Sequence, residues 1–200
     1  LMSTGMANME EIKLAVKTAK KANAKNISLL HCTSIYPTPA NLLNLAVIDL
    51  LRKKFNLRVG YSDHSLGTDV AKLAVAAGAR IIEKHFTLDS KRKGFDHAIS
   101  LEPAAFRKMV NGIRLLEKML GKSEKIVTKQ ERKKIPNLRR YLVIKNDVKA
   151  GEKFTRHNLG FRRILGNKGS LESKHFESIL GKKAKQKIAP QTPLKNKHFK

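Results

Sequence analysis

A strand, a helix and a second strand follow one another in the first half of this chain, and this order strongly limits the possible folds. The strand Leu57–Ser62 ends just before His64, and the strand Ala79–Thr87 contains His85. The segment between them, Thr68–Ala77, is rich in alanine and predicts a helix. Such a βαβ unit makes the two strands parallel and brings their carboxyl ends to the same edge of the sheet. Functional groups of α/β folds are built at that edge.

Two imidazoles at one edge of a sheet form a candidate site for a divalent metal. His64 and His85 are 21 residues apart, and each has an acidic residue nearby, Asp63 or Glu83. Imidazole and carboxylate ligands suit several divalent metals. Histidine pairs at this spacing are common, so the residues alone leave a second interpretation open, in which the two histidines are unrelated.

The same alternation of strand and helix runs through the first 120 residues four times. The strand Leu1–Thr4 precedes a helix that begins at Asn8, where a glutamate three residues later completes the spacing of a capping box. The strand Ile27–Thr33 precedes a helix over Asn41–Lys54, and a last helix covers Pro103–Leu120. The strands are apolar without strict alternation, which is typical of parallel strands covered on both faces. The fold class is therefore α/β.

The remainder of the chain has a different character. Residues 122–140 are basic and polar and are interpreted as a linker between a first domain, 1–121, and a second domain, 141–200. The second domain shows short apolar runs separated by turns, which predicts a small, mostly β fold.

Composition narrows the class of protein further. The 200 residues carry a net charge of +26, with 23 basic against 6 acidic residues after position 120. The lysines are scattered without an aromatic stacking ladder, so a nucleic-acid partner is not expected. A lysine-rich proteome explains the charge, and an anionic substrate is a second explanation. The single cysteine, Cys32, fits a reducing cytoplasm, and no apolar run approaches the ~18 residues of a membrane span.

Five short segments occur in the order LMSTGM, LHCTSIYP, GYSDHSLG, EKHFTLD and DHAISLEP. Together they resemble the C-terminal part of the sialic acid synthase family, whose members condense phosphoenolpyruvate with an N-acetylated amino sugar. The resemblance implies that residues 1–121 are the last four units, (βα)₄, of an eight-stranded TIM barrel. It also implies that residues 141–200 form an antifreeze-like SAF domain. The chain begins with Leu1 in a strand and is interpreted as a piece of a longer protein.

The resemblance implies a role for each polar group at the strand ends. It makes His64 and His85 ligands of a divalent metal, for which Mn²⁺ or Mg²⁺ fits an open site, and it places Glu83 in the active site as a catalytic residue. The remaining positions are implied substrate contacts: Ser3 and Ser34 for the enolpyruvate, Ser62 for its phosphate, and Tyr36 and Asp96 for the amino sugar. Ser34 stands where the family usually has asparagine or threonine. Without the resemblance, Ser3 fits a simple Ser-Thr-Gly turn and Asp96 a solvated loop.

In the family the SAF domain is exchanged within a head-to-tail homodimer, and one of its arginines contacts the N-acetyl group in the partner's site. The resemblance implies Arg163 for this role, with Arg162 as the alternative because the following turn departs from the family pattern.

Three functional hypotheses remain open. The catalytic glutamate of the family's first strand and its phosphate-binding lysines have no counterpart in this chain. The chain is therefore part of a synthase that needs the missing half, or a basic SAF-type binding module on a remnant half-barrel, or a truncated product without activity. Neither the product of the parent enzyme nor the identity of the metal follows from the sequence.

Overall fold

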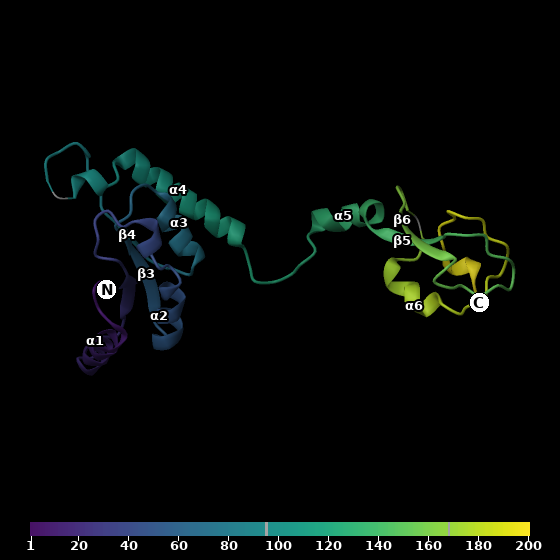
Figure 1. Cartoon of the computed structure of the whole chain (residues 1–200), viewed down its shortest axis with the longest axis horizontal. Coiled ribbons are helices and arrows are strands. Elements are labelled where there is room, and N and C mark those ends of the chain that lie inside the picture. Colours follow the sequence, from purple (N-terminus) through teal and green to yellow (C-terminus); the bar gives the residue numbers. More distant parts are fainter. Residues whose placement is uncertain (95, 168) are drawn as a thin grey trace. The chain divides into compact units, whose positions relative to one another are not determined.

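The structure is a computed structural model that describes residues 1–94, 96–167 and 169–200 (Figure 1). It divides into two compact units, Leu1–Ser123 and Glu124–Lys200. Each unit has a hydrophobic core of its own.

The first unit is a mixed α/β structure built on a parallel sheet. All the strand pairs in this sheet are parallel, in the order β1-β2-β3-β4, and helices connect consecutive strands. The sequence predicted this class of fold. The elements in chain order are β1 Met2–Ser3, α1 Met9–Lys21, β2 Ser28–His31, the 3-10 turn Ala40–Leu42, α2 Val47–Phe55, β3 Arg58–Asp63, α3 Asp69–Ala76, β4 Ile82–Lys84, the 3-10 turn His97–Ile99 and α4 Pro103–Leu120.

The start of α1 agrees with its sequence signal. The Asn8 side chain accepts hydrogen bonds from the backbone N–H groups of Glu10 and Glu11, both at 3.0 Å. The Glu11 carboxylate accepts the Asn8 N–H at 2.7 Å, which completes the predicted capping box. Ile12 and Val16 then turn into the core between the helices and the sheet.

The helix predicted over residues 41–54 is wrong in its first half. A 3-10 turn covers Ala40–Leu42, and the helix α2 begins only at Val47. The break lies at Asn44, which has a left-handed backbone with φ of 44°. Asparagine tolerates this conformation better than most residues, but a continuous right-handed helix does not.

The strand predicted over residues 79–87 is shorter in the structure, where β4 covers Ile82–Lys84. Beyond Lys84 the chain leaves β3 and pairs with a later segment. The Leu101 N–H donates to the His85 carbonyl at 2.9 Å, and Phe86 forms an isolated parallel bridge with Leu101. The loop that follows β4 is therefore tied back onto the strand end.

The second unit contains a two-stranded antiparallel ribbon and many short bridges. Its core gathers apolar residues from the whole unit, including Leu142, Ile144, Val148, Phe154 and Leu194. The elements are α5 Lys129–Leu138, β5 Arg140–Ile144, β6 Leu159–Arg163, the 3-10 turn Ser173–His175, α6 Phe176–Ile179 and the 3-10 turn Asn196–His198.

The helix α5 lies inside the segment that the sequence analysis interpreted as a linker. Its N-terminus has a capping box between Thr128 and Glu131. The Tyr141 hydroxyl donates to the Ile135 carbonyl at 3.3 Å and holds the end of this helix against β5. The segment has few apolar residues and was therefore not predicted as a helix, although the Thr-x-x-Glu spacing indicates a helix start.

Among the described residues of both units, no helix is long and apolar enough to cross a bilayer.

Candidate functional site

The orientation of His64 is set by the backbone of a neighbouring strand end. Its Nδ1 lies 2.9 Å from the Thr33 carbonyl oxygen, which can only accept a hydrogen bond. In the neutral ring Nδ1 therefore carries the proton, and Nε2 has a lone pair that can accept a hydrogen bond. Nε2 faces the Tyr36 hydroxyl at 3.2 Å and the Ser62 Oγ at 3.3 Å.

The structure brings the two candidate metal ligands together. The ring centroids of His64 and His85 lie 5.5 Å apart with an interplanar angle of 74°. Tyr36 stacks on His64 at 4.2 Å and presents an edge to His85 at 5.8 Å. Three side chains from different strand ends thus share one small space.

Ser62 and Glu83 lie next to this space. The two residues are directly paired in the register of β3 and β4. The Ser62 hydroxyl donates to Glu83 Oε1 at 2.6 Å, so its single proton is used there. No proton then remains between Ser62 Oγ and His64 Nε2, and the Nε2 lone pair accepts a hydrogen bond from the Tyr36 hydroxyl. A cation bound at Nε2 would take the place of that hydrogen bond.

Asp96 approaches His85 from the loop after β4. Its Oδ2 lies 3.6 Å from His85 Nδ1. The loop is held by a 2.8 Å hydrogen bond between His97 Nδ1 and Thr87 Oγ1. Asp96 is half exposed and free to accept a further hydrogen bond from a ligand.

Ser3 and Ser34 lie at the ends of the first two strands, and the described residues show no hydrogen bond from either side chain to the histidine pair. Gly5, between β1 and α1, lets the Ser34 side chain lie close to the backbone that follows β1. A Cβ atom at Gly5 would lie 2.4 Å from Ser34 Oγ and 3.0 Å from Cys32 Sγ. A side chain at Gly5 would force Ser34 Oγ to move.

Asp63 does not belong to this group, although the sequence placed it there. It pairs with Lys84, and both residues lie on the helix-facing side of the sheet because side chains alternate along a strand. Sequence reasoning missed Lys84, whose one signal was a lysine within a predicted strand.

His31 and Cys32, at the end of β2, are both buried. The Nε2 of His31 lies 2.9 Å from the Leu43 carbonyl, and burial lowers its pKa. Burial raises the pKa of the Cys32 thiol. Burial, with the nearby Cys32, Asp96 and Glu83, also raises the pKa of Tyr36, which therefore remains a hydrogen-bond donor at neutral pH.

Arg162 and Arg163 are both exposed and lie next to each other on β6 of the second unit. Neighbouring side chains of a strand point to opposite faces, so only one of them can serve a given site. The Arg162 guanidinium donates to the Gln191 side chain.

Among the described residues, no group of three or more histidine, cysteine, aspartate and glutamate side chains is arranged to hold a metal ion. The donor set of His64 and His85 with nearby hydroxyl oxygens nevertheless fits an open site, in which water and substrate supply the other ligands. The carbonyl of Thr33 behind His64 is the type of outer partner that metal-binding histidines use.

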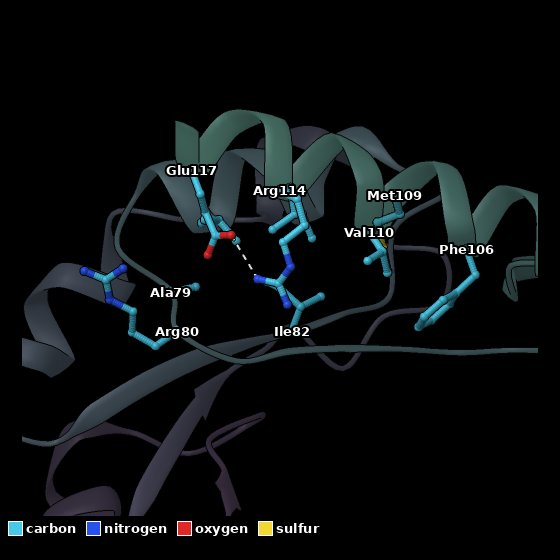
Figure 2. Close-up of a pocket in the computed structure, with 10 residues that line it drawn as sticks. Ala79, Arg80, Ile82, Phe106, Met109, Val110, Arg114 and Glu117 are labelled. Atoms are coloured by element: carbon cyan, nitrogen blue, oxygen red, sulfur yellow. Dashed lines mark hydrogen bonds and ion pairs between the residues drawn. The ribbon is translucent and has the colours of Figure 1, made fainter. Parts of the chain in front are cut away.

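A separate groove lies between α4 and β4 (Figure 2). Phe106, Met109 and Val110 line it from the helix, opposite Ala79 and Ile82. An ion pair between Arg114 and Glu117, 2.9 Å long, lies at one end. None of the candidate site residues lines this groove.

Residues 1–125, which hold the whole histidine site, match the NeuB family. The chain belongs to the NeuB family. Residues 139–200 match the SAF domain. The resemblance to sialic acid synthases and their SAF domain is thereby confirmed.

Relatives of this NeuB-family chain are named as synthases of nonulosonic acids. It is 44% identical over 184 residues to N,N'-diacetyllegionaminic acid synthase of Campylobacter jejuni, covering 91% of this chain and 54% of that protein. Other relatives are named pseudaminic acid synthase and N-acetylneuraminate-9-phosphate synthase. The chain thus spans about half the length of the curated relatives that it matches over most of its own length.

Solved structures with a similar fold include a protein of Chromobacterium violaceum and one of Leptospira borgpetersenii. Spore coat polysaccharide biosynthesis protein E of Chromobacterium violaceum is 30% identical, with a TM-score of 0.74, and the match covers 99% of this chain and 59% of that one. The N-acetylneuraminic acid synthetase of Leptospira borgpetersenii, solved in complex with citrate, is 41% identical with a TM-score of 0.62. That match covers 66% of this chain and 46% of that one.

Proposed function

We propose that this chain is part of a nonulosonic acid synthase that condenses phosphoenolpyruvate with N-acetylmannosamine or a related N-acetylated amino sugar. In this reaction C3 of phosphoenolpyruvate bonds to the aldehyde carbon of the sugar, water adds at C2, and phosphate leaves by C–O cleavage. The observation that carries the proposal is the convergence of His64, His85 and Tyr36 from three strand ends, with Ser62 and Glu83 beside them. Membership of the NeuB family supports it.

The parallel sheet of the first unit is proposed to be the C-terminal half of a TIM barrel. Among the described residues, the only strand paired with β4 is β3 and the only strand paired with β1 is β2. Apolar side chains of α4 line a groove next to β4 (Figure 2). Further βα units would continue the sheet there and bury that groove.

In the proposed site His64 and His85 would hold Mn²⁺ or Mg²⁺. The metal would act as a Lewis acid on the sugar aldehyde. Tyr36 packs on both rings and restricts their motion, and its hydroxyl donates a hydrogen bond. Glu83 orients the Ser62 hydroxyl, while Asp96 would accept hydrogen bonds from sugar hydroxyls.

Enolpyruvate binding is assigned to the carboxyl ends of β1 and β2, along the same edge of the sheet as the histidine site. Ser3, which ends β1, and Ser34, which follows β2, would contact it with hydroxyl groups, and Ser62 would contact its phosphate by turning its hydroxyl from Glu83 to the phosphate. The glutamate and the lysines that the family uses have no counterpart here. The chain by itself is therefore expected to be inactive.

A complementation experiment tests this function. The purified chain is mixed with a polypeptide that carries the part of the C. jejuni legionaminic acid synthase which this chain does not match. We expect phosphate release from phosphoenolpyruvate only when both polypeptides, an N-acetylated amino sugar and Mn²⁺ are present, and none with His85→Ala. Release by the chain alone would contradict the proposal. A mixture in which the two polypeptides co-elute but release no phosphate would also contradict it.

The charge of the second half supports one other candidate function, a basic binding module. Residues 121–200 carry 23 basic against 6 acidic side chains. Retention of residues 124–200 on a polyanion column at 0.15 M salt would favour this function, since screening weakens contacts between scattered surface charges at that salt concentration.

A further inference from the structure

A buried ion pair lies on the face of the sheet opposite to the histidine site. Lys84 Nζ lies 3.0 Å from Asp63 Oδ2, and the two side chains are 1% and 0% exposed. The residues face each other directly in the ladder between β3 and β4. None of the roles proposed above uses this pair.

The ion pair also holds the backbone that leaves β3. Asp63 Oδ1 accepts hydrogen bonds from the Ser65 backbone N–H at 2.9 Å and from the Ser65 hydroxyl at 2.6 Å. The Lys84 ammonium donates to the Ser65 carbonyl. Asp63, Ser65 and Lys84 are here called the Asp63 cluster. Asp63 and Ser65 flank His64 in the sequence, and Lys84 immediately precedes His85.

We propose that the Asp63 cluster is a positioning element that sets the separation of His64 and His85. Asp63 Oδ2 accepts no hydrogen bond among the described residues, so its charge is balanced by the Lys84 ammonium 3.0 Å away, and a slip of β4 along β3 would leave both buried charges without a partner. The Thr33 carbonyl sets the rotation of the His64 ring, whereas the Asp63 cluster sets the backbone positions from which both rings project. This inference rests on the proposed function, because the metal site that the two histidines would form is part of that proposal.

A single substitution in the pair does not test this inference cleanly, since it leaves one buried charge without a partner and unfolding follows. The test variant therefore combines Asp63→Asn with Lys84→Met, which removes both charges at similar volume. Asp69→Asn with Lys72→Met is the matched control, because it removes an ion pair of the same residue types, 2.6 Å long, from the surface of α3.

The first measurement needs no metal. In the full chain, NMR is used to record the nuclear Overhauser effects between the imidazole protons of His64 and His85, whose ring centroids lie 5.5 Å apart. We expect these signals in the wild type and in the control, and their loss or marked weakening in the double variant. A folded double variant with wild-type signals would overturn the proposal.

A milder variant keeps the test decisive if the double variant does not fold. Ser65→Ala removes one hydrogen bond to Asp63 and leaves the ion pair in place. It should weaken the same ring-to-ring signals, and wild-type signals in Ser65→Ala would then overturn the proposal.

The second measurement separates this inference from the proposed metal site. Calorimetric titration with Mn²⁺ should show affinity about 10–100-fold weaker in the double variant than in the wild type, the usual effect of losing an outer-shell partner. If the wild type binds no Mn²⁺, the metal site of the proposed function is wrong. The NMR result still decides whether the Asp63 cluster positions the two histidines.

Discussion

His64 donates its Nδ1 proton to the Thr33 carbonyl oxygen across 2.9 Å, and this bond joins the ends of β2 and β3. It leaves Nε2 as an acceptor that faces Tyr36 and Ser62. Because the partner is a backbone group, the tautomer of this histidine is built into the fold rather than into one replaceable side chain.

Loss of either histidine should weaken divalent-metal binding. We expect His64→Ala and His85→Ala each to lower Mn²⁺ affinity by at least about 10–100-fold, since removing even an outer-shell partner has that effect. Isothermal titration calorimetry measures the change. His157→Ala is the control, because His157 is exposed in the second unit. Wild-type affinity in both histidine variants would contradict the proposed shared metal site.

A side chain at Gly5 should collide with the second strand end. The Cβ of Gly5→Ala would lie 2.4 Å from Ser34 Oγ, so we expect a loss of about 1–3 kcal/mol in the free energy of unfolding, as for other overpacked sites. Adding Ser34→Ala removes the hydroxyl and should restore part of this loss. Urea denaturation of the single and double variants measures both effects. Equal stability of the two variants would show that Ser34 does not make the contact.

Acid should destabilise the first unit through His31. Burial lowers the pKa of His31 below 6.5, so between that lowered pKa and 6.5 the unfolded chain binds more protons than the folded chain. The free energy of unfolding should therefore fall as the pH drops through this window. His31→Gln can still donate to the Leu43 carbonyl and should remove this dependence.

Hydrogen exchange at the amides of Leu29 and Leu30 reports on this part of the sheet. It separates the effect of His31 from that of His198 in the second unit, whose pKa is also lowered by burial. An equally steep pH dependence in the His31→Gln variant would assign the acid sensitivity to another group.

Arg163 is predicted to act in the site of a partner subunit. In the complemented enzyme, mixing Arg163→Ala subunits with His85→Ala subunits should recover part of the activity, since one of the two mixed sites then holds both intact residues. The arginine fork is suited to an acetamido carbonyl and an anionic substrate. Arg162→Ala is the matched control, because its side chain points to the other face of β6. If heterodimers form and activity stays at the level of the single variants, the exchange between subunits is wrong.

The local signals in the sequence determined much of this protein. The capping box at Asn8, the helix Pro103–Leu120 and the parallel sheet all follow from short-range spacing and from the pattern of apolar residues. These features depend on backbone groups within a few residues of each other, so the sequence is sufficient for them. The short segments around His64 and His85 identified the family for the same reason, because each is a contiguous run.

Only the tertiary structure decided which polar residues share a face and which partners they take. Asp63 is adjacent to His64 in sequence, yet the alternation of side chains sends it to the opposite side of the sheet, where Lys84 is buried against it. The proton on His64 depends on the Thr33 carbonyl, which lies 31 positions earlier in the chain. Such contacts depend on strand register and long-range packing, and no local pattern of residue types encodes them.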